Sequence, residues 1–339
     1  MNKIVKLNKK GRALLFIKPL EIPRHILQAQ ALARRTPVSH LFKEKISNRA
    51  TNLFSGYKGE ESMNFQLQFL PEDDFFIFHY IRLPDQYGHF QLDYLLLTRC
   101  FHLIMEVKNI YDHMNFDEMG QAYRTRNGEV ELFGNPIEQV KLQHRRYLNW
   151  LRKFGFPPVP IKKIVVYSRD DTYLRNIAND KAVSDIVMHR DKALPKMEAF
   201  MKKYQTPLFS EHELMELSYR LLEEHVPEED GGMETWNMDY DDLVKGVFCS
   251  ECGEVPMRWK GGKWRCLACG CTSTTAHRPA LADYALLVGE YINNRQAREF
   301  LQVDSIHTAK RLIQQENFDQ FGNTSGRKYK IDVNKLLIR

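Results

Sequence analysis

Two acids and a lysine stand in two short apolar stretches that are typical of neighbouring β-strands. Asp93 lies in residues 91–97, and Glu106 and Lys108 lie in residues 102–108. Because side chains alternate between the two faces of a strand, Glu106 and Lys108 share a face, one pleat apart. Charges in such stretches need partners or a metal ion, because burying an unpaired charge costs several kcal/mol. The simplest alternative is an ion pair of Lys108 with Glu106 or Asp93 on an edge strand.

An acid followed by Glu-x-Lys on the next strand is also the spacing that metal-dependent nucleases use. Two carboxylates can hold a divalent cation, and a lysine can position a water molecule or stabilise charge on a phosphate. Asp93, at the right place in the preceding strand, favours this chemistry over a chance Glu-x-Lys.

A third acid, Glu60, falls on the apolar side of a predicted helix that begins near Glu44. The apolar side recurs at steps of three and four residues, as expected for a helix. Its members are Ile46, Ala50, Leu53, Phe54, Tyr57, Asn64 and Leu67. Glu61 lies about 100° further round the helix and should be more exposed. Glu60 is therefore a candidate metal ligand or water-positioning group, unless it sits at the edge of the apolar side and reaches solvent.

The elements around these residues predict an α/β domain. Residues 75–83 form an apolar strand, 84–89 a turn, 123–132 a hairpin around Asn127-Gly128, and 161–167 a further strand. Asn135 should cap a helix that starts at Pro136. Gln139 and Gln143 lie one turn apart on that helix. Its buried side should consist of Ile137, Val140, Tyr147, Leu148 and Leu151. The order of helix, three strands, hairpin, helix and strand favours a mixed sheet flanked by helices.

Four ordered motifs over residues 55–170 resemble the nuclease-related domain (NERD) family. They are Gly59-Glu60, Gln91-Leu92-Asp93, Glu106-Val107-Lys108-Asn109 and Asn135-Pro136-Ile137-Glu138-Gln139. That family belongs to the restriction-endonuclease-like PD-(D/E)XK superfamily, which implies a restriction-endonuclease-like mixed sheet flanked by helices. By resemblance, Glu60, Asp93, Glu106 and Lys108 are the expected catalytic set, and Gln139 is an accessory polar residue.

The resemblance implies metal-dependent hydrolysis of phosphodiester bonds. Asp93, Glu106 and the backbone carbonyl of Val107 would hold Mg²⁺ or Mn²⁺, which activates water. Lys108 would position that water or stabilise the charge on the phosphate. Glu60 would anchor the water shell of this metal ion or hold a second one.

Five of the six cysteines are concentrated in residues 249–271. Two Cys-x2-Cys pairs separated by thirteen residues are typical of a zinc ribbon: Cys249, Cys252, Cys266 and Cys269. Trp259 and Trp264 flank a Gly-Gly turn and indicate a small hairpin between the pairs. Four thiolates close the coordination sphere, so we expect structural Zn²⁺ rather than catalytic Zn²⁺. A redox role for the pairs is the alternative, and Cys271 could replace Cys269 as a ligand.

Residues 278–339 resemble winged helix-turn-helix domains. Helices are expected over 281–292, 295–301 and 305–316, with Tyr291 and Ile306 inward and Asn294 as a cap, followed by a hairpin wing over 322–331. The third helix would face DNA. The candidate DNA contacts are Lys310, Arg311, Gln314, Arg327 and Lys328. A helical protein-interaction module is the alternative, because this segment has only ten basic and seven acidic residues.

Charge is unevenly distributed along the 339 residues, whose net charge is +6. Residues 1–58 carry thirteen Lys or Arg and two acids, and residues 223–244 carry nine acids with no Lys or Arg. The basic arm favours a polyanionic partner, although a solvated face is equally compatible. The sequence contains no run of about 20 apolar residues, so a membrane span is not expected. The absence of a signal-peptide pattern and the clustered thiols suggest a cytoplasmic protein.

The expected domains are a basic, mostly helical arm (1–54), the nuclease-related domain (55–170), a helical extension (171–224), an acidic, mobile linker (225–245), the zinc ribbon (246–275) and the helix-turn-helix-like domain (278–339). Two functions fit them. One is a metal-dependent deoxyribonuclease directed to DNA by the C-terminal modules. The other is a non-catalytic DNA-binding regulator or adaptor with a nuclease-like fold. Activity on RNA and the oligomeric state stay open.

Overall fold

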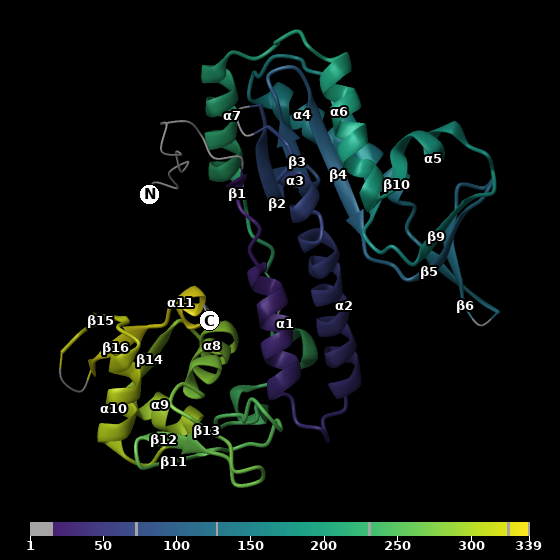
Figure 1. The fold of residues 1–339 in the computed structure, drawn as a ribbon. Coiled ribbons are helices and arrows are strands. Elements are labelled where there is room, and N and C mark those ends of the chain that lie inside the picture. Colours follow the sequence, from purple (N-terminus) through teal and green to yellow (C-terminus); the bar gives the residue numbers. More distant parts are fainter. Residues whose placement is uncertain (1–15, 72–73, 127, 230–231, 324–325, 338–339) are drawn as a thin grey trace. The chain divides into compact units, whose positions relative to one another are not determined.

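The structure of the chain, a computed structural model, describes residues 16–71, 74–126, 128–229, 232–323 and 326–337 (Figure 1). The fold is mixed α/β with several sheets, and it divides into two compact units. Unit 1 contains the described residues up to 23 and from 54 to 228, and unit 2 contains residues 24–53 and those from 229 onward. The basic residues before position 16 lie outside the described part.

The main sheet of unit 1 has six strands in the order β1-β2-β3-β4-β8-β10. Strands β2, β3 and β4 pair antiparallel, whereas β1 with β2, β4 with β8, and β8 with β10 pair parallel. The mixed sheet expected from the sequence is therefore present. Its strands are β1 (Phe16–Lys18), β2 (Phe76–Asp85), β3 (Gly88–Leu97), β4 (His102–Lys108), β8 (Ile161–Tyr167) and β10 (Val187–His189).

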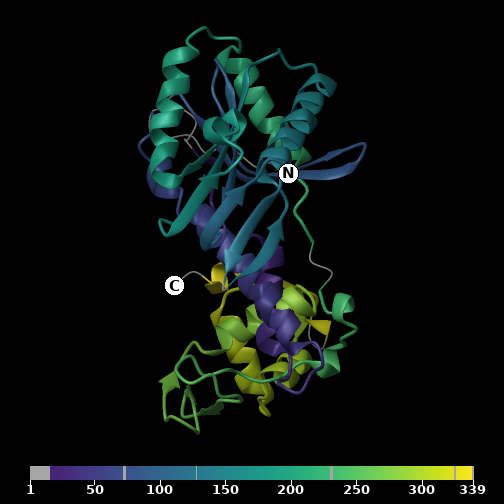
Figure 2. The ribbon, with the colours of Figure 1, turned by 90° about the vertical axis from the view of Figure 1, so that its right-hand side faces the viewer.

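Helices cover both faces of this sheet (Figure 1, Figure 2). Helices α4 (Pro136–Lys153) and α7 (Glu211–Glu224) share one apolar core with Ile104 and Val165 of the strands. Helices α3 (Asn64–Leu67) and α6 (Ala193–Lys203) share the other core with Met105. The Asn135 side chain caps α4 by accepting a hydrogen bond from the Ile137 amide at 2.9 Å, as predicted.

A second sheet of unit 1 has four strands in the order β7-β6-β5-β9. They are β5 (Asp112–Phe116), β6 (Ala122–Arg126), β7 (Glu129–Phe133) and β9 (Thr172–Asn176). Strands β6 and β7 form the predicted hairpin, although its Asn127 lies outside the described residues. The segment 171–224, expected to be a helical extension, contains α6 and α7, but its first part also contains β9 and β10 around α5 (Lys181–Ile186), which was not expected. These strands have only five and three residues, and their pairing with β5 and β8 stabilises them where the sequence has no longer apolar run.

Unit 2 is built from helices with two small sheets. Its helices are α1 (Arg24–Arg35), the first part of α2 (Lys43–Glu61), α8 (His277–Leu287), α9 (Asn294–Leu301), α10 (Ile306–Gln315) and α11 (Val333–Leu337). One sheet pairs β11 (Arg258–Lys260), β12 (Lys263–Arg265) and β13 (Thr272–Ser273). The other has the order β14-β16-β15, from β14 (Tyr291–Asn293), β16 (Lys328–Lys330) and β15 (Asp319–Phe321).

Several details of the C-terminal expectation are corrected. Helix α8 ends at Leu287, before Gly289, because glycine is a poor residue for a helix interior. Tyr291 therefore lies in β14, where it is exposed rather than inward. The side chain that caps α9 is Asn293, one residue before the expected Asn294. Ile306 is the first residue of α10 and is also exposed.

Residues 225–245, expected to be a mobile linker, contribute apolar side chains to unit 2. Met238 and Leu243 are buried in its core with residues of α8 and α9.

Two arginines of the basic arm, expected to face a polyanion, form ion pairs within unit 2 instead. Arg34 and Arg35 both form ion pairs with the buried Asp283 of α8.

Among the described residues, the structure has no helix with the length and apolar character that a membrane crossing requires.

Candidate active site

Asp93 and Glu106 face each other across two neighbouring strands. Strands β3 and β4 are antiparallel with Tyr94 opposite Met105, so one step further along the pair Asp93 lies opposite Glu106. Both side chains are buried, with 8% and 3% of their surface exposed. Carboxylates placed opposite each other destabilise a sheet unless a cation or a proton neutralises one of them. The sheet thus forms a site that a cation or a bound proton would stabilise.

Asp93 is hydrogen-bonded to the backbone of the neighbouring strand. Its Oδ2 accepts from the Val107 amide at 2.8 Å. Burial raises the pKa of Asp93 well above its usual range, and the charges of Glu106 and Glu60 raise it further. Lys108 and the Val107 amide oppose this shift without cancelling it.

Glu106 is surrounded by three side-chain donors. Its Oε1 accepts from Lys108 Nζ and from Gln139 Nε2, both at 2.7 Å. Its Oε2 accepts from Gln143 Nε2 at 2.8 Å. Burial alone would lower the pKa of Lys108, but Glu106 and Asp93 outweigh it and raise that pKa, so the lysine carries its charge. The Lys108–Glu106 ion pair therefore lies in the same site as the two facing carboxylates. Asp93, Glu106 and Lys108, with Glu60 described below, are called the carboxylate cluster.

Gln143 is a site residue that the sequence reasoning did not assign. It is buried, and besides Glu106 it donates to the Gln91 carbonyl oxygen at 3.0 Å. Gln139 and Gln143 are four residues apart on α4, so both reach the same strand surface. That spacing was visible in the sequence. The signal that would have separated Gln143 from an ordinary surface amide is its burial between α4 and the strands, which only the fold provides.

Glu60 joins this cluster from the last turn of α2. Its Oε2 lies 2.5 Å from Nε2 of the buried His79 on β2. Burial and the charge of Glu106 raise the pKa of Glu60 to about 8, whereas burial and Lys18 lower the pKa of His79 to about 3. The proton between them therefore resides on Glu60 at neutral pH. As expected, Glu61 is more exposed than Glu60, at 39% against 13% of the side chain.

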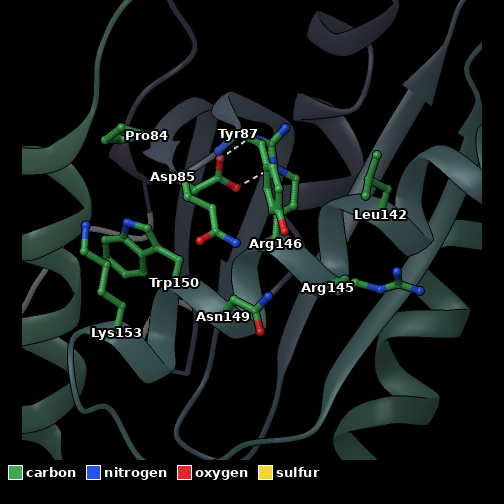
Figure 3. Close-up of a pocket in the computed structure, with 10 residues that line it drawn as sticks. Pro84, Asp85, Tyr87, Leu142, Arg145, Arg146, Asn149, Trp150 and Lys153 are labelled. Atoms are coloured by element: carbon green, nitrogen blue, oxygen red, sulfur yellow. Dashed lines mark hydrogen bonds and ion pairs between the residues drawn. The ribbon is translucent and has the colours of Figure 1, made fainter.

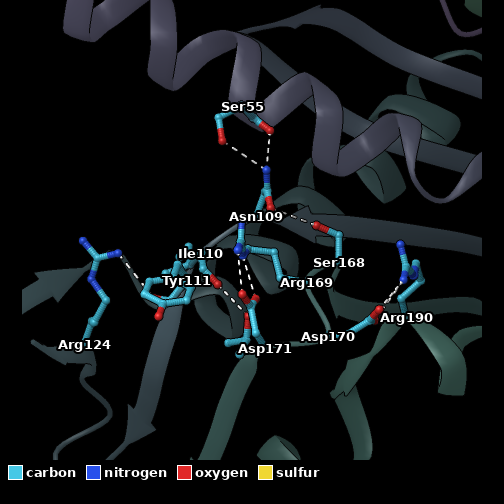
Figure 4. Close-up of polar contacts among 11 residues, drawn as sticks. Ser55, Asn109, Ile110, Tyr111, Arg124, Ser168, Arg169, Asp170, Asp171 and Arg190 are labelled. Carbon is cyan, nitrogen blue, oxygen red and sulfur yellow. Dashed lines mark hydrogen bonds and ion pairs between the residues drawn. The ribbon is translucent and has the colours of Figure 1, made fainter.

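The close approach of α2 to the strand ends depends on Gly59. A Cβ atom at this position would lie 2.5 Å from Cβ of Asn109 and 2.9 Å from Oγ of Ser168. Asn109 Nδ2 in turn donates to the carbonyl oxygen and to Oγ of Ser55, at 2.6 and 3.1 Å (Figure 4). The hydroxyl of Tyr94 also donates to the Glu60 carbonyl oxygen, at 2.9 Å. These contacts fix the position from which Glu60 reaches the cluster.

A second candidate site, in unit 2, is made of thiols. The Sγ atoms of Cys249, Cys252, Cys266 and Cys269 all lie within 4.8 Å of one another. The Cys249–Cys269 and Cys252–Cys266 Sγ distances are 3.6 and 3.5 Å. Four ligands at about 2.3 Å from a tetrahedral Zn²⁺ would lie about 3.8 Å apart, so the cluster suits zinc.

Other features of this segment agree with a zinc ribbon. Trp259 and Trp264 lie opposite each other in the predicted hairpin. Cys271 is not part of the four-thiol cluster.

The residues expected to contact DNA also lie in unit 2. Lys310, Gln314 and Lys328 are exposed, whereas Arg327 is half-buried. The Arg311 guanidinium lies 5.5 Å from the centre of the Trp259 ring, so this side chain packs on the cysteine-bearing segment. Arg311 therefore contacts an aromatic ring of unit 2, although no acid neutralises its charge among the contacts of the described residues.

The segment that carries the carboxylate cluster has a recognisable family. The model of the family described as "Nuclease-related domain" matches residues 55–168. Residues 55–168 are therefore similar to the nuclease-related domain family. The match agrees with the range expected from the motifs and contains every member of the cluster together with Gln139 and Gln143. No curated protein and no solved structure has a significant match to the chain.

Proposed function

We propose that the protein is a metal-dependent nuclease that hydrolyses phosphodiester bonds of DNA. The observation that carries this proposal is the buried pair Asp93 and Glu106, placed opposite each other beside Lys108 inside a nuclease-related domain. A mixed sheet with helices on both faces is also the architecture of the restriction-endonuclease-like superfamily, to which we assign unit 1.

The donor set fits a hard divalent cation. Asp93 and Glu106 offer carboxylate oxygens, the Val107 carbonyl is the neighbouring backbone oxygen, and Mg²⁺ and Mn²⁺ prefer such ligands. Burial and the neighbouring acids Glu106 and Glu60 disfavour the ionised form of Asp93, and a divalent cation held beside it would favour that form. When bound, Mg²⁺ or Mn²⁺ would polarise the phosphate and lower the pKa of an attacking water.

The chain's own side chains would orient the reactants. Lys108 is charged and would stabilise the negative charge that develops on the phosphate. Gln139 accepts from Lys108 Nζ at 2.9 Å and donates to Glu106, so it holds both in register. Gln143 holds the other oxygen of Glu106. Glu60 carries a proton at neutral pH and would give it up when positive charge enters the site.

Unit 2 would bind DNA and so direct the nuclease to its substrate. The order α8, β14, α9, α10, β15 and β16 is the order of elements in a winged helix-turn-helix, with α10 as the reading helix. Lys310, Gln314 and Lys328 are its exposed candidate contacts. The four cysteines would hold a structural Zn²⁺, which persists in a reducing compartment such as the cytoplasm.

Cleavage of plasmid and single-stranded DNA tests the proposal. We expect hydrolysis by the full chain with Mg²⁺ or Mn²⁺, none without a divalent cation, and none by Asp93→Ala. The control is Asp241→Ala, an exposed acid of unit 2 that lies outside the cluster. DNA binding without cleavage, under all these conditions, would instead support the regulator or adaptor.

A further inference from the structure

An open groove lies beside the cluster on unit 1, between helix α4 and the tip of the β2–β3 hairpin (Figure 3). Its volume is about 920 Å³. Its lining comes from the hairpin residues Pro84, Asp85, Gln86 and Tyr87 and from the α4 residues Leu142, Arg145, Arg146, Asn149, Trp150 and Lys153. None of these residues belongs to the carboxylate cluster.

The residues that line the groove have a net positive charge. It holds three cations, Arg145, Arg146 and Lys153, and one acid, Asp85. Arg146 pairs with Asp85 through two hydrogen bonds of 2.5 and 2.6 Å, which uses both charges. Arg145 and Lys153 are exposed, and neither has an acidic partner in the part of the chain that the structure describes. Lys153 Nζ also lies 5.1 Å from the centre of the Phe154 ring, a contact that does not neutralise its charge. Two cations of the lining can thus bind an anion.

An aromatic side chain stands at the mouth of the groove on a fixed backbone. Tyr87 has 77% of its surface exposed at the tip of the hairpin. Its amide donates to Asp85 Oδ1 at 2.8 Å, and the same carboxylate is held by Arg146. The ring is therefore presented to solvent by an anchored turn. Exposed aromatic rings beside cations are the pattern with which proteins stack unpaired bases and bind the adjoining phosphates.

Helix α4 carries residues that line the groove and residues that contact the carboxylate cluster. Arg146 donates to the His89 carbonyl on β3, and Gln143, one turn earlier on α4, donates to the Gln91 carbonyl and to Glu106. Helix α4 and strand β3 therefore lead from the groove to Glu106. At 1.5 Å per residue, α4 covers roughly 21 Å between Gln139 and Lys153, enough for several nucleotides.

We propose that this groove binds single-stranded DNA next to the scissile phosphate, with Tyr87 stacked on a base and Arg145 and Lys153 on phosphates. This deepens the proposed nuclease function and rests on it. The substrate would then be a DNA with an unpaired segment, such as a tail or a flap, rather than a blunt duplex.

Photocrosslinking in the full-length Asp93→Asn protein tests the groove without any cleavage step. The probes are a single strand with 5-iododeoxyuridine, the RNA strand of the same sequence with 5-iodouridine, and a blunt duplex with 5-iododeoxyuridine. We expect the single-stranded DNA to crosslink to Tyr87, with the attached peptide identified by mass spectrometry. The double variant Arg145→Ala, Lys153→Ala should lower the yield about tenfold. The matched control Arg152→Ala removes an exposed arginine of the same helix that does not line the groove, and it should leave the yield unchanged.

Three results would overturn the proposal: no crosslink at Tyr87, an equal yield from the blunt duplex, or an equal fall in yield for Arg152→Ala. Crosslinking by the RNA strand alone would overturn the assignment to DNA. Because these readouts require no hydrolysis, failure of the groove is distinguishable from failure of the nuclease proposal. A wild-type protein that crosslinks at Tyr87 but cuts no DNA would keep the groove and reject the nuclease.

Discussion

Glu106 has donors on both of its oxygens, whereas Asp93 accepts from a backbone amide. This asymmetry indicates that the strands and α4 hold Glu106 in one orientation, while Asp93 keeps lone pairs that a cation could use. The sequence predicted the two acids and Lys108 from alternation along the strands. It could not predict Gln143 or His79 as neighbours, because each stands in an ordinary helix or strand pattern and acquires its contact only when α4 and α2 pack on the sheet.

Replacing Gln143 with Leu tests the orientation of Glu106. The Gln143→Leu variant leaves the Glu106 Oε2 and the Gln91 carbonyl without their donor, so we expect DNA cleavage to slow about 10- to 100-fold. The effect should fall on kcat and on the Mn²⁺ concentration needed for half-maximal rate. Lys141→Ala is the control, since Lys141 is exposed on the same helix and pairs with Glu138. Equal rates for the two variants would show that Gln143 does not act on the site.

The raised pKa of Glu60 predicts how divalent-metal affinity depends on pH. Below about pH 8 the Glu60 carboxyl is largely protonated, so a cation that enters the site must displace that proton. Affinity for Mn²⁺ should therefore rise with pH, and a smaller rise should persist in Glu60→Gln because the pKa of Asp93 is raised as well. Calorimetry in buffers of different ionisation enthalpy would measure the released proton. Affinity that is flat between pH 6 and 8, or unchanged in slope in Glu60→Gln, would contradict this assignment.

At the scale of elements, the close approach of the end of α2 to the strands requires a glycine at position 59. Apolar runs predicted β2, β3, β4 and β8, and helical spacing of apolar residues predicted α2 and α4. They missed β5, β9 and β10, which have only three to five residues each and too short an apolar pattern to predict a strand before neighbouring strands pair with them. The close contact at Gly59 was equally invisible, because a glycine within a helical pattern gives no sign of what lies against it.

Two glycines of α2 provide a matched test. Alanine at Gly59 would place Cβ 2.5 Å from the Asn109 side chain, so Gly59→Ala should destabilise unit 1 by about 1–3 kcal/mol and displace Glu60. A Cβ atom at Gly56 would meet no neighbour within 4 Å, so Gly56→Ala should stabilise by about 0.5–1 kcal/mol through helix propensity. Urea unfolding followed by hydrogen exchange of unit 1 amides measures both. A Gly59→Ala protein as stable as Gly56→Ala would mean that α2 does not need this close approach.

At the scale of the whole molecule, the chain places its two candidate metal sites in separate compact units. The carboxylate cluster lies in unit 1 and the four thiols lie in unit 2. Cys249, Cys266 and Trp264 are buried in the core of unit 2 with residues of α8 and α10. The cysteine spacing alone predicted the cluster, but not its integration into that core, because such packing depends on contacts with helices distant in sequence.

Zinc should therefore stabilise unit 2. We expect about one zinc per chain, measured by plasma emission spectrometry, and its loss in Cys266→Ser together with a lower melting temperature of unit 2. Cys271→Ser removes a thiol outside the cluster and should retain the metal. Zinc retained in Cys266→Ser and lost in Cys271→Ser would contradict the ligand set.

The most direct test of the central claim is the Mn²⁺ dependence of DNA cleavage, measured beside Mn²⁺ binding on the same samples of wild type and Glu106→Gln. The carboxylate cluster predicts that the wild type binds Mn²⁺ and cuts over the same concentration range. It also predicts that Glu106→Gln loses both together while its zinc content stays unchanged. Cleavage that persists in Glu106→Gln, or a wild type that binds Mn²⁺ and cuts no DNA substrate, would contradict a nuclease built on Asp93, Glu106 and Lys108.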